Sequence, residues 1–129
     1  DLSENPFTPV EWRMAYKMLQ DAGMAPDWIE QDKEIRRELD ALDVWFKQQA
    51  QWQCKKRTKM KALAVERMIS ERERLARVRE QTIDEYRRRA AALNKVIDTF
   101  DLKAPSANFH RERIRIEEEI QRFRDACGT

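Results

Sequence analysis

Residues 35–46, IRRELDALDVWF, and residues 86–100, YRRRAAALNKVIDTF, carry the pattern that decides the fold. In both stretches apolar side chains recur at steps of three and four residues, the spacing of one face of an α-helix. They are Ile35, Leu39, Leu42 and Phe46, followed much later by Tyr86, Ala90, Leu93, Ile97 and Phe100. Alternating steps of four and three are typical of a coiled-coil seam. The sequence therefore predicts an all-α fold.

The composition supports the same fold class. Charged residues make up 39% of the 129 residues and hydrophobic ones 41%, with only two glycines and four prolines. So few turn-forming residues exclude a sandwich or barrel of many short strands, because hairpins need glycine or a similar residue at positive φ. Four Trp, five Phe and five Met are more apolar material than a disordered chain carries. Long helices are therefore the structure that this composition favours.

We expect a single helical domain over residues 1–129, in three parts. Residues 1–26 form an N-terminal arm and a short helix, which starts at Thr8-Pro9. Residues 27–100 contain no Gly or Pro and form either one very long charged helix or a helical hairpin broken near 54–70. Residues 101–129 form a turn at Pro105 and a short C-terminal helix that folds back. The drift of the apolar register without Gly or Pro favours the single long helix over a tight turn.

Charge is distributed unevenly along the chain, although its net value is only +2. Residues 1–54 contain six Lys/Arg against eleven Asp/Glu, whereas residues 55–95 contain fourteen against six. Such asymmetry indicates charged partners. The alternative is that the acidic and basic stretches face each other within the fold or in an assembly.

The basic stretch 55–61 is a candidate site of contact with RNA phosphates. Its cations are Lys55, Lys56, Arg57, Lys59 and Lys61. Lys and Arg displace the counterions of a phosphate backbone without reading its sequence. The alternative is a solvated helix face, on which residues four apart pair their charges.

Aromatic side chains form a second candidate site, for a protein partner. Trp45, Phe46 and Trp52 lie on an otherwise polar segment, and exposed aromatic clusters mark protein interfaces. The alternative is burial within this chain, against Trp12, Tyr16 and Met18 of the first helix.

Residues for catalysis or metal binding are scarce. His110 is the sole histidine, so metal sites and proton relays built on histidine pairs are excluded within one chain. Cys54 and Cys127 have no neighbour at metal-ligand spacing, and a bridge between them is compatible with the sequence but not demanded by it. No run approaches the roughly 20 apolar residues of a membrane span, and no targeting segment is visible. We expect no enzyme activity, no cofactor and no small-molecule substrate.

Two blocks of sequence, one near each end of the chain, carry a family resemblance. The first block, within residues 1–43, contains Asn5-Pro6-Phe7, Trp12–Leu19, Ala22-Gly23, Trp28-Ile29-Glu30 and Lys33-Glu34-Ile35. The second, within residues 93–123, contains Leu93–Asp98, Phe100, Leu102, Pro105 and Ser106. In their order and spacing the two blocks resemble the conserved domain of the DnaJ-homologue subfamily C member 28 family. The resemblance implies a stand-alone domain and a mitochondrial location, on the matrix side. It carries over no catalytic residues, and the His-Pro-Asp triplet of a J domain is absent because Arg111 follows His110.

These observations favour a non-catalytic structural or adaptor subunit that binds other proteins within a larger, mitochondrial assembly. An RNA-associated accessory protein of an organellar ribosome is the first alternative, and it depends on the basic stretch. A chaperone-like assembly factor that binds transiently is the second.

Overall fold

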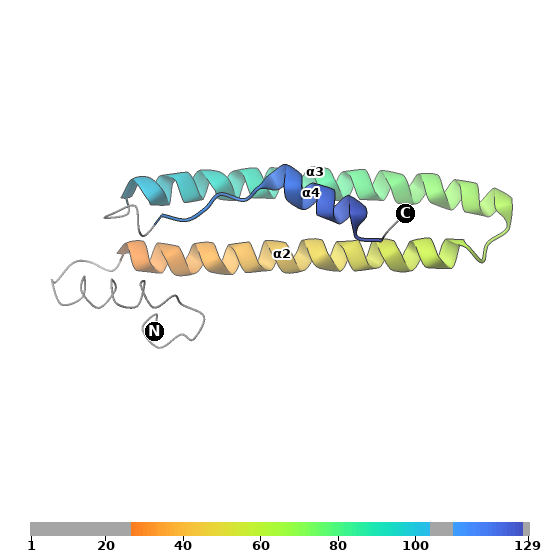
Figure 1. The fold of residues 1–129 in the computed structure, drawn as a ribbon, viewed down its shortest axis with the longest axis horizontal. Coiled ribbons are helices and arrows are strands. Elements are labelled where there is room, and N and C mark those ends of the chain that lie inside the picture. The colour runs from red at the N-terminus through yellow and green to blue at the C-terminus, as the bar shows by residue number, and fades with distance from the viewer. Residues whose placement is uncertain (1–26, 104–109, 128–129) are drawn as a thin grey trace. The chain divides into compact units, whose positions relative to one another are not determined.

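The computed structural model describes residues 27–103 and 110–127, which contain three helices. Helix α2 spans Asp27–Met60, α3 spans Val65–Lys103 and α4 spans Ile116–Asp125 (Figure 1). No strand occurs in the described ranges, and the predicted all-α class is confirmed. The helix predicted within residues 1–26 and the turn predicted at Pro105 lie outside the described residues.

The central segment is a helical hairpin, so the preference for one long helix is wrong. Helix α2 ends at Met60, and residues 61–64 lead back into α3. The backbone N–H groups of residues 61–63 donate to carbonyls three residues earlier, at 3.1–3.3 Å, which are the short bonds that tighten a helix end. The reversal uses neither Gly nor Pro. It occurs because the two apolar seams can bury each other only when the chain folds back, whereas a single helix would leave both in water.

The chain divides into two compact units. Within the described residues, unit 1 contains 27–37, 95–103 and 110–113, and unit 2 contains 38–94 and 114–127. Each unit has buried apolar side chains from both α2 and α3. The single-domain organisation expected over residues 1–129 stays a prediction.

Unit 1 is organised around a buried carboxylate. Asp32 is fully buried, and the Arg111 guanidinium donates through Nε to its Oδ1 at 2.6 Å. Arg36 lies 3.7 Å from the other carboxylate oxygen. A buried charge is tolerated only when it is paired, because desolvation of a lone carboxylate costs several kcal/mol. The pair therefore fixes the segment beyond residue 109 to α2, next to the ring contact of Trp28 with Phe100 at 6.3 Å.

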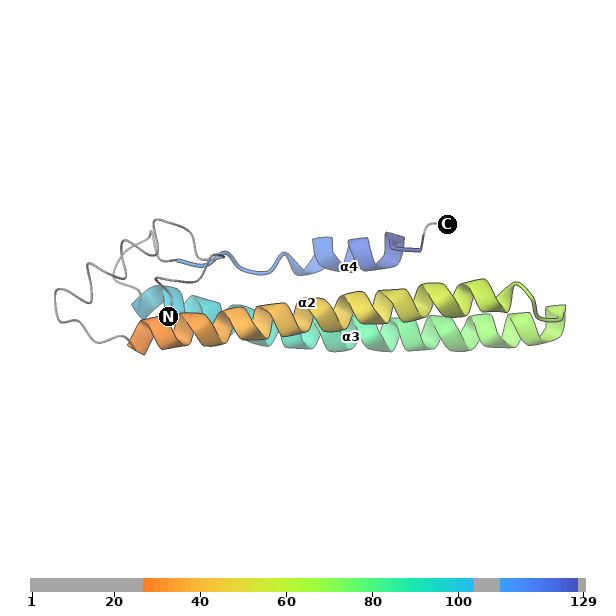
Figure 2. The same ribbon diagram turned by 90° about the horizontal axis from the view of Figure 1, so that it is seen from below.

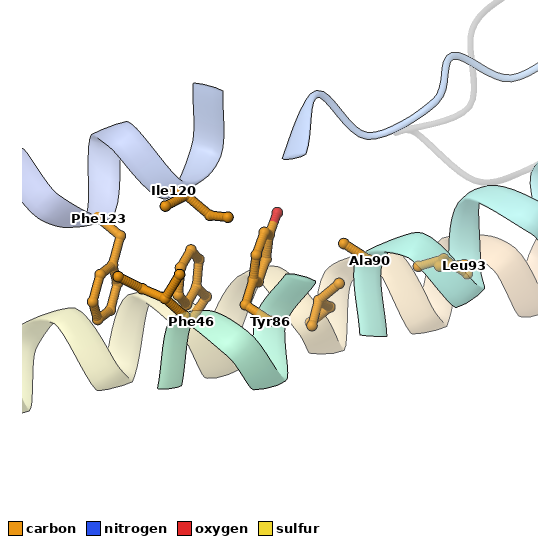
Figure 3. Close-up of a cluster of buried hydrophobic side chains, with 8 residues drawn as sticks. Phe46, Tyr86, Ala90, Leu93, Ile120 and Phe123 are labelled. Carbon is orange, nitrogen blue, oxygen red and sulfur yellow. The ribbon is translucent and has the colours of Figure 1, made fainter. Parts of the chain in front are cut away.

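Unit 2 contains an aromatic stack at the centre of its core. The Phe46 ring lies between Tyr86, at 3.8 Å between centroids, and Phe123, at 4.3 Å, and both pairs are nearly parallel. Figure 3 shows Ile120 and Phe123 of α4 directed towards Phe46 and Tyr86. All four side chains are buried together with those of other core residues, namely Leu42, Ile83, Ala90 and Leu93. Helix α4 thus supplies one side of this core.

Helix α4 is held at both of its ends. At its start, the buried Asn94 side chain accepts from the Ile114 N–H at 2.6 Å and donates to the Ile114 carbonyl at 3.1 Å. At its end, Cys127 forms a disulfide with Cys54 of α2, across a Cα–Cα distance of 5.2 Å. The two hydrogen bonds of Asn94 pair backbone groups of Ile114, which lies before the helix and has no helical partner. Together with the disulfide, they fix α4 to both long helices.

Two ion pairs add to this attachment. Arg87 donates from Nε and Nη2 to the Glu117 carboxylate at 3.0 and 3.3 Å, and Arg124 donates to both oxygens of Glu80 at 2.7 and 3.3 Å. The hydrogen bonds from the guanidinium groups lower the pKa values of Glu80 and Glu117. Both pairs are exposed enough for solvent to screen them, so each contributes little to stability.

Candidate functional site

The outer part of the hairpin in unit 2 has no core of its own. None of the residues 54–81, which we call the hairpin tip, is buried. Buried side chains occur on either side of the tip, at Gln53 of α2 and Thr82 of α3. Two helices that pack side by side without a third element leave much of their apolar surface in water. The tip is therefore where this unit has surface left to cover.

A pocket of roughly 450 Å³ opens between the two helices at the tip. Its apolar lining consists of Trp52, Met60, Leu63, Leu75 and Val78. Its charged lining consists of Lys56, Lys59, Arg67 and Arg74, with Glu71 as the one acidic residue. We call this pocket the tip groove. Its volume lies within the range of about 300–1,000 Å³ that is usual for binding pockets.

The tip groove faces away from α4. Residues two apart on a helix point about 200° apart around its axis. Cys54 bonds to the end of α4, and Trp52, two residues earlier, lines the groove. The same relation holds on α3, where Glu80 binds Arg124 of α4 and Val78 lines the groove. Figures 1 and 2 show α4 against one side of the α2–α3 pair. One face of the hairpin is thus covered by the chain itself and the opposite face is open.

Positive charge dominates around the groove. Residues 52–78 contain nine Lys/Arg and three Glu. Glu71 lies 4.0 Å from Arg74, so part of the only negative charge in the lining is already neutralised. The Lys56 ammonium lies 5.7 Å from the centre of the Trp52 ring, a cation–π distance. The four lining cations are exposed, whereas four of the five apolar lining residues are half-buried, so the apolar residues form the floor and the cations the edges. This arrangement suits a ligand that is apolar on one side and anionic along its flanks.

The three aromatic residues predicted to bind a partner have different environments. Phe46 is only 6% exposed, because the rings of Tyr86 and Phe123 stack on both of its faces. The alternative of burial against Trp12 and Tyr16 involves residues outside the described ranges. Trp45 is half-buried beside it, with the Arg89 guanidinium 4.5 Å from its ring. Trp52 is 40% exposed and lines the groove.

The five cations predicted to contact phosphate all lie at the hairpin tip. Lys55, Lys56, Lys59 and Lys61 are exposed and Arg57 is half-buried. Within residues 27–103 and 110–127, none of the five takes part in an ion pair. Lys56 and Lys59 line the groove and the other three do not. The RNA-contact prediction itself remains untested by this geometry.

Sequence reasoning missed the half of the groove that comes from α3. Arg67, Glu71, Arg74 and Val78 follow one another at steps of four, three and four residues, which places them on one face of a helix. This spacing was a usable signal for a mixed charged and apolar face. It did not show which segment of the chain would lie opposite.

The described residues offer little for chemistry on a small molecule. Among them, no three His, Cys, Asp or Glu side chains lie close enough together to hold a metal ion. His110 is exposed, and burial raises the pKa of Tyr86 to about 12, so this phenol stays protonated at neutral pH. In the described parts of the chain, none of the helices meets the length and hydropathy needed to cross a membrane.

Comparison with known proteins supports the first block of the family resemblance. The family model "DnaJ homologue, subfamily C, member 28, conserved domain" matches residues 1–43, about a third of the chain. The match does not extend to the second block at 93–123. Neither a curated protein nor a solved structure matches the chain. Of the matched residues that the structure describes, Trp28, Ile29, Asp32 and Ile35 are buried in unit 1, so this part of the matched pattern contributes to the core.

Proposed function

We propose that this chain is a non-catalytic structural or adaptor subunit that binds other proteins within a larger assembly. The single observation that carries the proposal is the tip groove, an open apolar surface in a part of unit 2 that has no core. Apolar surface left exposed in a small protein is most often covered by a partner.

The residue types in the groove support a protein partner. Trp and Arg supply most of the binding energy at protein interfaces, and the groove contains Trp52, Arg67 and Arg74. Of the three aromatic residues predicted to bind a partner, Trp52 is the one that lines the groove, and the proposal assigns the contact to it. Trp45, half-buried and stacked on Arg89, belongs to the surface beside it.

A mitochondrial location, on the matrix side, is part of the proposal through the family resemblance. The Cys54–Cys127 disulfide points the other way, because disulfides persist in oxidising compartments and are rare where glutathione and thioredoxin keep thiols reduced. Thiol alkylation in intact cells, followed by mass spectrometry, distinguishes the bridged chain from the reduced one. A fully reduced pair is the result expected on the matrix side.

An RNA-associated role remains the second candidate. The observation that favours it is the set of five cations over residues 55–61, none of which has an ion-pair partner among the described residues, since Lys and Arg displace counterions from phosphates. Affinity for RNA should then fall steeply as salt rises, and a triple change of Lys55, Lys56 and Arg57 to alanine should weaken it. RNA binding that responds to neither removes this candidate. A transient assembly factor, the third candidate, would be recovered with its complex in sub-stoichiometric amounts.

Site-specific crosslinking tests the main proposal. A photo-crosslinking amino acid replaces Trp52 in cells, and the same amino acid replaces Val44 as a control, because Val44 is 52% exposed on α2 but does not line the groove. We expect one protein to be crosslinked from position 52 in amounts close to stoichiometric, and not from position 44. Crosslinks to RNA alone, or the same products from both positions, would overturn the proposal.

A further inference from the structure

We infer that the tip groove binds an acidic amphipathic α-helix of about three turns that a partner protein supplies. The inference rests on the proposed function and gives its partner a chemistry. It draws on the shape of the groove, the placement of its charges and the way in which the same hairpin already binds α4.

The floor of the groove sets the length of the bound segment. The groove is lined on α2 from Trp52 to Met60 and on α3 from Arg67 to Val78, which are distances of about 12 and 16 Å at 1.5 Å per residue. A helix of about three turns covers this length. Helices that bind in grooves place apolar anchors at positions i, i+3 or i+4, and i+7. Such a segment would cover Met60, Leu75 and Val78, which are half-buried and, within residues 27–103 and 110–127, have no third helix over them.

The two walls of the groove set the charge of the bound segment. Lys56 and Lys59 project from α2, and Arg67 and Arg74 from α3. Arg67 takes part in no ion pair among the residues that the structure describes. Cations on both walls match a helix with carboxylates on both sides of its apolar strip. An Arg–carboxylate pair can be bidentate and is stronger than a neutral hydrogen bond, so the arginines of α3 give the groove its preference for acidic segments.

The opposite face of the hairpin shows that these helices bind a third one by such contacts. There α4 inserts Phe123 against Phe46, and its Glu117 accepts two hydrogen bonds from Arg87. The tip groove repeats this combination of residue types, since its lining contains the aromatic ring of Trp52, further apolar side chains and two arginines. Helix α4 has ten residues, close to the length that the groove requires.

Two other occupants fit the groove less well. A phosphate backbone would satisfy the cations but leave the five apolar side chains uncovered. A second copy of the chain would bring a hairpin tip of the same positive charge. On residues 30–44 of such a copy, which are acidic, the one strongly exposed large apolar side chain is Val44. An acidic partner helix satisfies the floor and the walls together.

Fluorescence anisotropy with synthetic probes tests the inference. The acidic probe is a labelled helical peptide of about 14 residues, with Leu at alternating steps of three and four and Glu on both flanks. Its matched control carries Lys in place of every Glu, and a labelled single-stranded RNA of about 20 nucleotides is a third probe. We expect the acidic peptide to bind the full chain, more weakly at high salt, and the lysine peptide not to bind.

Substitutions inside and outside the tip groove test whether the acidic peptide binds there. Arg67→Ala and Leu75→Asp should each weaken the acidic peptide about tenfold or more, because they remove a charge-assisted bond and an apolar contact. Val44→Asp and Arg122→Ala, exposed positions outside the groove, should change affinity by less than about twofold. Circular dichroism melting checks that all four variants fold. Neither Arg67 nor Leu75 is buried, so both changes leave the core intact.

The outcomes separate this inference from the proposed function. Three results would overturn the inference of an acidic helix. They are equal binding of the acidic and basic peptides, an affinity that neither groove substitution changes, and displacement of the peptide by the RNA. If Trp52 crosslinks to a protein in cells while the acidic peptide does not bind, the adaptor function stands and this inference fails. If position 52 crosslinks to no protein, the function fails whatever the peptide does.

Discussion

Replacing Phe46 by alanine tests whether this residue is a core residue or a partner contact. Its ring is stacked between Tyr86 and Phe123 and is only 6% exposed. Burial of a phenylalanine and the cavity left by its removal together account for about 3–5 kcal/mol. That loss is large beside the 5–15 kcal/mol that stabilises a typical domain. The structure therefore predicts that Phe46→Ala severely destabilises unit 2.

The assay is thermal unfolding followed by circular dichroism. At about 4 °C per kcal/mol for a chain of this size, Phe46→Ala should lower the melting temperature by about 12–20 °C. Phe46→Leu keeps most of the volume and should lower it much less. The matched control is Val44→Ala, which changes a 52% exposed side chain on the same helix and should cost less than about 0.5 kcal/mol.

A Phe46→Ala chain that melts like the unchanged protein would refute the aromatic stack. Such a result would also support the prediction from sequence that Phe46 lies on the surface and contacts a partner protein. A chain that melts far lower, with Val44→Ala unaffected, supports the core position and leaves Trp52 as the aromatic residue available to a partner.

Three further predictions concern the attachment of α4. Replacing Cys54 and Cys127 by serine, or reducing the bridge with dithiothreitol, should lower the unfolding free energy by up to about 4 kcal/mol, because the bond closes a loop across 73 residues of sequence. Differential scanning calorimetry measures this loss of stability. No loss is expected if the bridge does not form. The pKa of Glu117 is lowered by its hydrogen bond to an arginine of α3. Its contribution to the free energy of unfolding is therefore present above the unfolded-state pKa of 4.5 and is lost as pH falls through the lower folded pKa. Urea unfolding at a series of pH values should show that Glu117→Gln removes this part of the acid dependence, whereas an unchanged profile speaks against the pair. Replacing Asn94 by alanine should cost about 1–3 kcal/mol, because two backbone groups of Ile114 lose their partner; hydrogen exchange should accelerate at Ile114 and not in α2.

The helices and much of the core could be predicted from sequence because their signal is local. Ile35, Phe46 and Tyr86 belong to apolar series with helical spacing, and all three are buried. A helical period depends only on residues a few positions apart, so it is visible without knowledge of the fold. The same locality explains why the stack around Phe46 could not be predicted: its two stacking partners are about 40 and 77 residues further along the chain.

The reversal at residues 61–64 and the disulfide could not be predicted, because both depend on distant pairing. Residues 61–64 contain no Gly or Pro, and their conformation follows from the packing of α2 against α3. Cys54 and Cys127 meet only after α4 has folded onto the hairpin. Local propensity is a weak prior in such cases, and tertiary contacts override it.

Only part of the candidate site could be predicted, because the site too depends on the pairing of distant segments. The cations of residues 55–61 and Trp52 were visible as composition on one helix. Arg67 and Arg74 had the spacing of a helix face, but the face opposite them was unknown without the hairpin. A groove between two helices is a property of their pairing, and a single sequence shows each wall separately.

The absence of buried side chains from residues 54–81 has a consequence for dynamics that can be measured. Amide groups open most easily where few apolar contacts hold a helix. The backbone hydrogens of the hairpin tip should therefore exchange faster than those of residues 82–93, where Ile83, Tyr86, Ala90 and Leu93 are buried. Adding the acidic peptide should slow exchange at the tip and leave residues 82–93 unchanged, since the bound helix would supply the contacts that the tip lacks. Uniform protection along α3 without peptide would mean that the tip is stable without a third helix, and the physical reason for expecting a partner there would be lost.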